Sequence, residues 1–515
     1  VKGGYCTGGA CDDPLCYPAQ SAISQVMCGD ITPPNPNCGV GACDAAGQYC
    51  DNCTCYTVDH ALSQALCACA GSNAGANTFQ KVYGHFEGDD IAKTGIELSD
   101  GGFLFGGWSG MVVRTDKYGE PLWIKTFEYL FVQDVVATDS TFYILAADGL
   151  IATTWDGTVK WAINSMGYAT SVALAPDGGV VFGGRRNNGS GDDAYLAKVS
   201  TNGTFEWATT YGGDNFDWIT HIEPVQDGYA LLGTTNNFGA VGMDYLLIRT
   251  DLNGSTQWAK RLSTSGTDGD SIFYYRTKHT TDGGFIVAGT TYQAATTNSG
   301  LAIKLTATGN VSWATTVGGD HGHDFSAVTE VKNGYVFFGT SKDIPVVDFP
   351  LTIGKANVWL CKLDMQGGLL WNRAYGEVGM DGNYVDGGST SDGGFFLVSH
   401  SHNYFIETPD EKQQYLIKTD HEGRTEGCCN DVPTLFTVGS SNVTSVDVTN
   451  QIVSKMLAKG PPPLPVTVKP YTKATRGTIC ERSRGKLCDG LSTGYLDFNV
   501  PYSLAPTPVG CNCTP

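Results

Sequence analysis

Short apolar runs alternate with acidic-glycine turns along most of this sequence, and the alternation repeats. Most units open on a turn such as Asp227-Gly228, continue through one apolar run, and reach a second that ends on Lys or Arg. Most units then close on a Gly and a Trp a few residues apart. Short apolar runs bounded by Gly-containing turns predict β-strands. The closing tryptophans are Trp123, Trp161, Trp207, Trp258, Trp313 and Trp371.

This repeat predicts an all-β fold, a β-propeller with seven blades. A period of roughly 40 to 60 residues with four strand-like segments in each unit is typical of that architecture. We place the repeats at residues 77–429. The seventh unit begins at Asp392 and lacks its last strand, whereas residues 78–84 resemble the last strands of other units. We therefore expect strand 78–84 to complete blade seven and close the ring.

Residues 227–235, 244–251 and 257–258 resemble the extracellular β-propeller repeats of secreted and cell-surface proteins of prokaryotes and some protists. The resemblance covers the repeats and leaves both flanking regions unmatched. That family has no single activity, so the resemblance implies display, adhesion or assembly only in general terms.

The two flanking regions differ in composition from the repeats. Residues 1–76 form a Cys-rich module in which residues 58–70 favour a helix. In the tail, residues 430–515, the pattern at 445–459 predicts an amphipathic helix, and the prolines of 460–465 require an extended backbone. The tail has too little apolar mass for its own core, so we expect it to lie along its own propeller or along a neighbour.

Cysteine clustering predicts a disulfide-rich protein made in an oxidising compartment. Zinc binding by Cys50, Cys53 and Cys55 is the weaker alternative, because structural zinc sites usually pair two Cys-x2-Cys or His-containing halves. Cys361 aligns with core positions of the other units, which predicts a buried free thiol. The other cysteines are then odd in number, so one is left unpaired or bonds another chain. These disulfide candidates are Cys6, Cys11, Cys16, Cys28, Cys38, Cys43, Cys50, Cys53, Cys55, Cys67, Cys69, Cys428, Cys429, Cys480, Cys488, Cys511 and Cys513.

Several features predict an extracellular or cell-surface location. No apolar run is long enough to span a membrane, and a start at Val1 leads us to expect that a signal peptide has been removed. The net charge of −20 argues against a nucleic-acid partner. N-linked glycans are expected at the Asn-x-Ser/Thr sequences of Asn52, Asn188, Asn202, Asn253, Asn310, Asn442 and Asn512. Three of these, Asn202, Asn253 and Asn310, occupy equivalent turns on one face of the disc, and Asn188 is expected on the other.

One acidic and one basic residue recur in most units, which we interpret as a repeated structural hydrogen-bond or ion-pair set. A symmetric set is a poor match to catalysis, which needs a unique constellation. We expect no cofactor, although the carboxylates permit calcium. The acidic series is Asp90, Asp217, Asp270, Asp324 and Asp381, and the basic series is Arg114, Lys198, Arg249, Lys304, Lys362 and Lys418.

Two His-x-His pairs, His321/His323 and His400/His402, are the candidate metal ligands. Residues i and i+2 of a strand share a face, so each pair has chelating geometry for copper or zinc, although polar loop residues are the favoured interpretation. Trp108 and Trp218 are candidate sugar platforms, for which packing between blades is the favoured alternative.

The leading functional hypothesis is a non-enzymatic structural subunit of an extracellular filament, appendage or surface coat. Its main partner would be a second copy of itself, which an arm reaches by β-strand addition. A glycan-binding adhesin or lectin is the first alternative, and a secreted glycan-active enzyme is the second.

Overall fold

The computed structural model describes most of residues 77–470 and a few short segments beyond them. The described residues are 11–12, 48–51, 54–57, 77–84, 89–128, 130–189, 191–240, 242–263, 267–268, 275–294, 297–318, 322–341, 357–375, 384–402, 412–425, 431–432, 437–457, 460–470, 475–481, 492–495 and 512–513. The predicted helix at 58–70 lies outside them.

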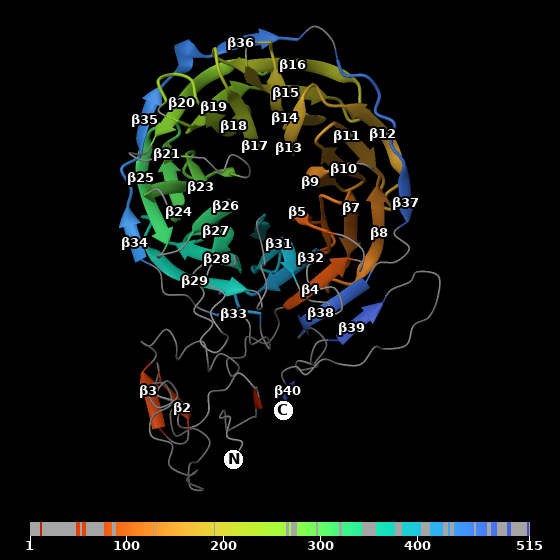
Figure 1. The fold of residues 1–515 in the computed structure, drawn as a ribbon, viewed down its shortest axis with the longest axis vertical. Helices are drawn as coiled ribbons and strands as arrows, with labels where there is room; N and C mark the ends of the chain where they lie inside the picture. The colour runs from red at the N-terminus through yellow and green to blue at the C-terminus, as the bar shows by residue number, and fades with distance from the viewer. Residues whose placement is uncertain are drawn as a thin grey trace.

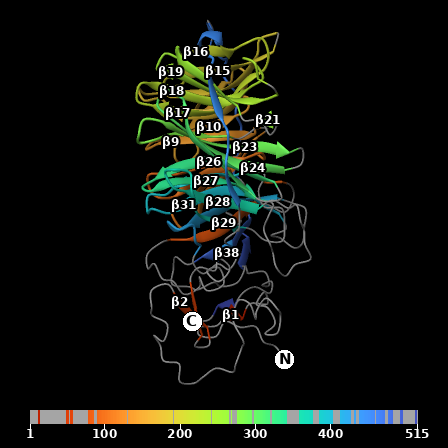
Figure 2. The same cartoon turned by 90° about the vertical axis from the view of Figure 1, so that its left-hand side faces the viewer.

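Seven antiparallel sheets stand in a ring around a central axis, which confirms the predicted seven-bladed propeller (Figure 1). Each sheet runs from an inner strand at the axis to outer strands at the rim. Edge-on, the ring is a thick disc (Figure 2). The cores lie between neighbouring blades, where one cluster combines residues such as Leu196 of blade three with Leu231 and Ile248 of blade four. Every blade therefore depends on its neighbours for a buried face.

Blade one consists of β5 (Ala92–Glu97), β6 (Phe103–Gly107), β7 (Met111–Thr115) and β8 (Pro121–Phe127). Blade two consists of β9 (Val132–Thr138), β10 (Thr141–Ala146), β11 (Gly149–Thr153) and β12 (Val159–Asn164). Blade three consists of β13 (Tyr168–Leu174), β14 (Val180–Asn187), β15 (Asp192–Val199) and β16 (Phe205–Gly212). Blades four and five are β17 (Asp217–Val225), β18 (Gly228–Thr235), β19 (Asp244–Asp251) and β20 (Thr256–Ser263); and β21 (Thr267–Asp268), β22 (Thr277–His279), β23 (Phe285–Ala294), β24 (Thr297–Leu305) and β25 (Val311–Gly318). Blade six is β26 (His323–Val331), β27 (Gly334–Ser341), β28 (Asn357–Leu363) and β29 (Leu369–Tyr375).

Blade seven combines both ends of the repeat region. It contains β30 (Asp386–Ser389), β31 (Phe395–His402), β32 (Lys412–Thr419) and, on the outer side of β32, the early strand β4 (Phe79–Gly84). In this antiparallel pair Tyr415 lies opposite Val82. Hydrogen bonds between strands from the two ends of the segment therefore close the ring.

The recurring Gly and Trp join neighbouring blades. The indole of Trp161 in blade two donates to the carbonyl of Thr201 in blade three, at 3.0 Å. Its ring packs on Gly203, where φ is +84° and an added Cβ would lie 2.7 Å from the indole. Only glycine combines that backbone with that approach. The same pairing recurs at Trp207–Gly254, Trp258–Gly309, Trp313–Gly367 and Trp371–Gly423.

The C-terminal segment runs around the outside of the disc (blue in Figure 1), and we call the described parts of residues 431–481 the girdle. It adds a strand to the outer edge of six blades, visiting blades six, five, four, three, one and seven in turn. Blade two receives one bridge, between Ile163 and Pro463. The girdle strands are β33 (Asp431–Val432), β34 (Thr437–Ser440), β35 (Thr444–Asp447), β36 (Val453–Met456), β37 (Val468–Pro470) and β38 (Thr475–Glu481).

The helix predicted at 445–459 is wrong. In its place lie β35, the short 3-10 turn η2 (Thr449–Gln451) and β36. Local helical periodicity is outweighed because each blade offers an unpaired outer edge, and an extended chain satisfies those main-chain groups. The β-branched Thr444 and Val446 of β35 and Val453 of β36 also suit a strand.

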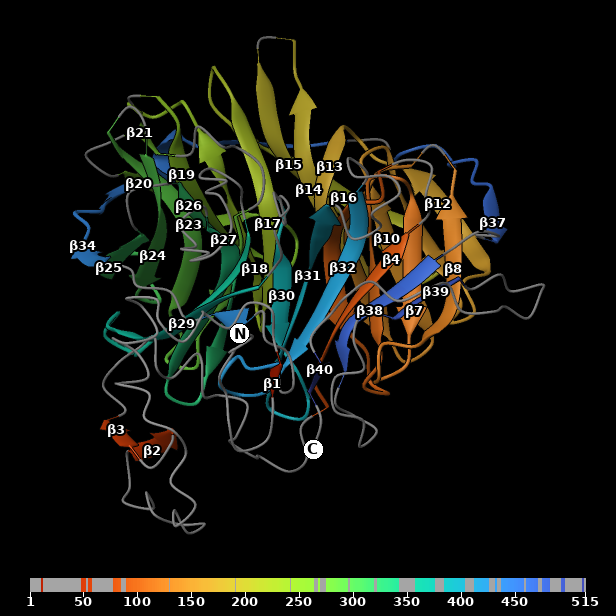
Figure 3. The ribbon, with the colours of Figure 1, turned by 60° about the horizontal axis from the view of Figure 1, so that its bottom comes forward.

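Short strands from the two terminal regions form two separate pairs beyond the rim of the disc (Figures 1 and 2). The strand β1 (Cys11–Asp12) pairs with β40 (Asn512–Cys513), and β2 (Gln48–Asp51) pairs with β3 (Thr54–Thr57). The tail strand β39 (Ser492–Tyr495) pairs with β38, which in turn pairs with β4 (Figure 3). The two ends of the chain therefore meet.

Candidate functional site

Near the axis, each blade has a polar residue at an equivalent position. This residue belongs to the inner strand or, in blade five, immediately precedes β22. In five strands this residue forms a β-bulge, at which the register with the second strand shifts by one. The sequence signal is an apolar residue, two residues that are mostly polar, then an apolar residue, as in Ile219-Thr220-His221-Ile222. The equivalent residues are Lys93, Gln133, Thr170, Thr220, Arg276, Ser326 and Asp386, which we call the axial ring.

Side chains of the axial ring reach across to the next blade. The hydroxyl of Thr170 donates to the carbonyl of Ile219 at 2.5 Å, and that of Thr220 donates to the carbonyl of Tyr275 at 3.0 Å. Ser326 makes the equivalent bond to the next blade, and Lys93 donates to Gln133. The bulges thus turn polar side chains toward carbonyls that the inner strand edge leaves without a strand partner.

The residue that follows in the chain accepts a main-chain N–H from the next blade. Asp134 accepts from Val172 at 3.0 Å, Ser171 accepts from Ile222 at 3.1 Å, and His221 Nδ1 accepts from Thr277 at 3.3 Å. Burial lowers the pKa of His221 well below its usual value, which keeps Nδ1 an acceptor.

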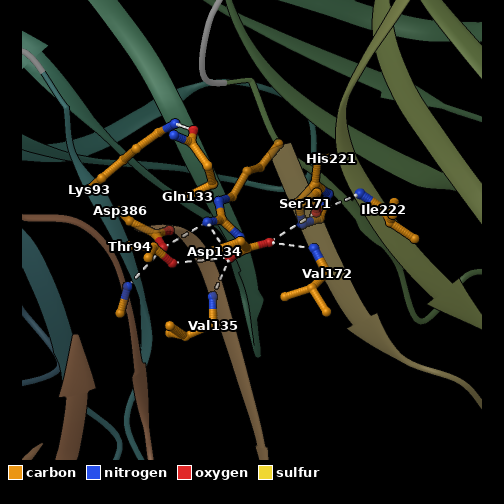
Figure 4. Close-up of polar contacts among 12 residues, drawn as sticks. Lys93, Thr94, Gln133, Asp134, Val135, Ser171, Val172, His221, Ile222 and Asp386 are labelled. Atoms are coloured by element: carbon orange, nitrogen blue, oxygen red, sulfur yellow. Dashed lines mark hydrogen bonds and ion pairs between the residues drawn. The ribbon is translucent and has the colours of Figure 1, made fainter. Parts of the chain in front are cut away.

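Arg276 links the carboxylates of Asp134 in blade two and Asp386 in blade seven, both of which are labelled in Figure 4. Its guanidinium lies 2.8 Å from Asp386 and 3.2 Å from Asp134. Asp134 also accepts from the hydroxyls of Thr94, at 3.0 Å, and Ser171, at 2.9 Å. One carboxylate therefore gathers blades one, two, three and five into a single hydrogen-bonded centre.

Buried charge in this centre is largely compensated. Burial raises the pKa of Asp386, against the opposing effect of Arg276, and burial lowers the pKa of Lys93 well below its usual value. Lys93 keeps only 6% of its surface exposed. These partners bind the blades to one another, so the arrangement supports a structural role for the axial ring.

The rim is a second candidate site, because here the chain binds itself by strand addition. In four blades an Ala follows the closing Trp, and the carbonyl of this Ala accepts a main-chain hydrogen bond from the girdle. The donors are Ser441 to Ala314 at 3.0 Å, Val448 to Ala259 at 3.0 Å, Leu457 to Ala208 at 2.8 Å and Leu464 to Ala162 at 3.1 Å. The Trp-Ala pair therefore marks both a blade junction and a girdle contact.

The girdle places apolar side chains between blades but leaves most of its surface exposed. Val448 is fully buried in the core between blades three and four, and Leu464 packs on the core between blades one and two. By contrast, Val453 is 68% exposed and Met456 is 66% exposed. Main-chain hydrogen bonds and a few apolar anchors thus hold the girdle in place.

The predicted basic series forms ion pairs, but with a different acidic series from the one expected. The partner is the Asp of the acidic-glycine turn, as in Lys304–Asp282 at 2.8 Å. In blade six that turn carries Asn333, which cannot form an ion pair with Lys362. The pairs are Arg114–Asp100, Lys198–Asp177, Arg249–Asp227, Lys304–Asp282 and Lys418–Asp392.

The expected acidic series lies at the opposite ends of the strands. Asp217 accepts from Asn237 Nδ2 at 2.7 Å and from the Gly213 amide at 2.9 Å. Asp324 accepts from the hydroxyl of Thr340. Asp90 is fully buried, whereas Asp270 and Asp381 lie outside the described residues. The carboxylates of Asp217 and Asp324 therefore accept hydrogen bonds from groups in loops and at strand ends.

Two of the four candidate metal ligands, His323 and His400, are described with their side chains, and they lie in strands of different blades. His323 is fully buried at the start of β26, with its ring 5.6 Å from that of Trp359, and His400 is buried in β31. His321 and the side chain of His402 lie outside the description. No group of three or more His, Cys, Asp or Glu side chains among the described residues is placed to hold a metal ion.

The two candidate sugar platforms differ in exposure. Trp218 is 2% exposed and lies beneath the Arg185 guanidinium, 4.8 Å from its ring. Trp108 is 39% exposed, its ring lies 5.3 Å from that of Tyr384 and 6.5 Å from that of Phe131, and Phe131 is 54% exposed. Trp218 is thus a packing residue, and Trp108 belongs to an exposed aromatic patch.

Five of the predicted glycosylation sites are exposed, namely Asn188, Asn202, Asn253, Asn310 and Asn442. Asn52 lies outside the described residues, as does the side chain of Asn512. Cys361 is a free thiol buried in β28, and burial raises its pKa well above the usual value. Among the described residues, no helix has both the length and the apolar character of a membrane span.

Comparisons with known proteins add only distant structural similarity. No family model matches the chain, and no curated protein matches it. A protein of unknown function from Bacteroides caccae is 14% identical, with 58% of this chain and 94% of that chain covered and a TM-score of 0.35. The WD40 β-propeller domain of Doa1 is 16% identical (62% and 93% covered, TM-score 0.35), and BamB from Moraxella catarrhalis is 14% identical (64% and 86% covered, TM-score 0.34). The fold assignment therefore rests on the strand pairing itself.

Proposed function

We propose that this protein is a structural subunit of an extracellular filament, appendage or surface coat, assembled from copies of itself. The observation that carries the proposal is the girdle, which adds strands to the outer edges of six blades. Main-chain pairing does not depend on which copy of the chain supplies the strand. A girdle that leaves its own disc and binds a neighbour's would form a head-to-tail contact, and repetition of that contact gives an open polymer.

The chemistry of the girdle suits such exchange. Its strands are short and its side chains are largely exposed, as for the fully exposed pattern of β36. Removing it exposes unpaired outer edges on the discs, which a second girdle satisfies with the same hydrogen bonds. The closed arrangement in the structure and a polymer thus share one set of contacts and differ in connectivity.

Negative-stain electron microscopy of native, non-reduced protein tests this proposal, with a chain lacking residues 430–515 as the comparison. Fibres that disappear on truncation would support a polymer built by the tail. Single discs in both samples would overturn it. The full-length Val448→Asp variant guards against misfolding of the truncated chain, because it removes one buried girdle anchor and leaves all blade residues intact.

The exposed aromatic patch of Trp108, Phe131 and Tyr384 is the specific observation that favours the lectin alternative. Exposed rings present flat apolar surfaces of the kind that recognition sites use. Saturable binding to a glycan array by monomers, lost in Trp108→Ala and retained in Trp218→Phe, would support this function. Absence of glycan binding by the wild-type protein would overturn the lectin alternative.

A further inference from the structure

Two short antiparallel pairs in the Cys-rich terminal regions bring cysteines opposite one another. In the pair of β1 with β40, Cys11 lies opposite Cys513. In the pair of β2 with β3, Cys50 lies opposite Cys55. Two separate strand pairs therefore match cysteine with cysteine at the same register position, and the first pair joins segments from the two ends of the chain.

This register is suited to disulfide formation. Directly opposed residues of an antiparallel pair have Cα atoms about 4.5 or about 5.5 Å apart. A disulfide spans Cα separations of roughly 4.4 to 6.8 Å. A shift of the pair by one residue would place Asp12 or Asn512 opposite a cysteine. The observed register is therefore compatible with a disulfide between these two residues.

We propose that Cys11 and Cys513 of one chain form a disulfide that joins the C-terminal end of the tail, beyond the girdle, to the N-terminal module. The two thiols lose two protons and two electrons as the Sγ–Sγ bond forms. A disulfide oxidant accepts the electrons by thiol–disulfide exchange and is reduced to a dithiol. The inference rests on the extracellular location that belongs to the proposed function.

The bond has a consequence for the girdle because of where its two ends attach. The N-terminal module continues into β4, the outer repeat strand of blade seven, and the girdle's β38 pairs with that same strand. A link between residues 11 and 513 closes a covalent loop through the whole propeller and the girdle. A girdle that exchanges with a neighbour must then either exchange before this bond forms or stay joined to the N-terminal module of its own chain.

Peptide mapping of the full-length, non-reduced protein tests the proposal. Free thiols are first alkylated, the protein is digested with pepsin, and linked peptides are sequenced by mass spectrometry. A Cys11–Cys513 peptide from protein that runs as a monomer on a non-reducing gel is the expected result. Cys11 bonded to any other cysteine, or a Cys11–Cys513 link found only in higher bands, would overturn the intrachain bond while leaving an oxidising location intact. Complete alkylation of all cysteines would overturn both.

A pair of matched variants adds a functional readout. Cys513→Ser should free Cys11 for alkylation and speed proteolytic cleavage of the girdle severalfold. Cys511→Ser, two residues away, should leave Cys11 blocked and the girdle as resistant as in the wild type. Equal cleavage in both variants would contradict the fastening role even if the bond forms.

Discussion

The inner and outer edges of the blades differ in how their main-chain hydrogen-bonding groups find partners. At both edges, strand N–H and C=O groups have no further strand of the sheet to bind. At the axis, side chains such as Asp134 and Ser171 bind the main chain of the next blade. At the rim, the main chain of the girdle supplies an additional strand to six blades.

This difference separates a fixed contact from an exchangeable one. The axial contacts need particular side chains, several of them charged and buried, at particular positions. The rim contacts need only an extended backbone and an occasional apolar anchor. We therefore expect substitutions at the axis to destabilise the disc itself, whereas substitutions in the girdle change its attachment to the disc.

The largest effect is expected from Asp134→Ala. It would remove the acceptor shared by Thr94, Ser171 and Val172 and would leave Arg276 with one carboxylate partner fewer. Loss of one member of a buried charged network costs about 3–5 kcal/mol. Urea denaturation monitored by intrinsic fluorescence would measure the free energy of unfolding. Asp139→Ala, at an exposed turn, is the control and should change it by less than about 0.5 kcal/mol; equal effects would show that the axial centre is not special.

In the girdle, Val448→Asp and Val453→Asp form a matched pair. Val448 is fully buried between blades, whereas Val453, on the same girdle, is 68% exposed. A charge at the first position would cost roughly 2–4 kcal/mol of girdle attachment, because a buried carboxylate would lack a partner. Limited proteolysis should release the tail from the first variant and spare the second. A tail equally resistant in both would contradict the anchoring role of Val448.

The inner edge also contains a group whose effect depends on pH. Burial raises the pKa of Asp217 from 3.8 to about 6. Its stabilising contribution is therefore complete below about pH 4 and is lost as the pH rises through 6. Between pH 4 and pH 7.5 the wild type should lose about 2 kcal/mol relative to Asp217→Asn, which stays neutral. Parallel denaturation curves across this range would refute the shift.

The smallest effect is expected from Asp447→Asn. Asp447 pairs with Lys260 across the girdle contact at 2.9 Å, but its side chain is 61% exposed. Exposed ion pairs contribute less than about 1 kcal/mol, and salt screens them. Girdle release by the variant should therefore differ little from the wild type at low ionic strength and not at all at high ionic strength. A large, salt-independent effect would mean that side chains, rather than the backbone, hold the girdle.

Much of the fold could be predicted because its cause is local. The acidic-glycine turns and the closing Gly and Trp are needed wherever the chain reverses or two blades meet, so most blades repeat the signal. The missing last strand of the seventh unit, and its counterpart at 78–84, could be recognised for the same reason. The axial ring was missed although it has a signal, since two polar residues inside a short apolar strand, as at Thr170-Ser171, mark most of the bulges.

The girdle shows what sequence reasoning could not supply. Residues 445–459 have helical periodicity, and nothing in their local pattern indicates a blade edge. Likewise, the ion-pair partner of Lys304 in β24 is Asp282, in the turn between β22 and β23 of the same blade, which becomes its neighbour only when β23 and β24 pair.

By itself, then, the sequence determined the repeat, the number of blades and the turn and junction residues, because these follow from short-range periodicity and backbone geometry. Only the tertiary structure decided where the tail lies, which carboxylates meet Arg276, and that Cys11 faces Cys513. Those contacts join residues that are far apart in the chain. Their partners exist only after the ring has closed, and no local pattern encodes them.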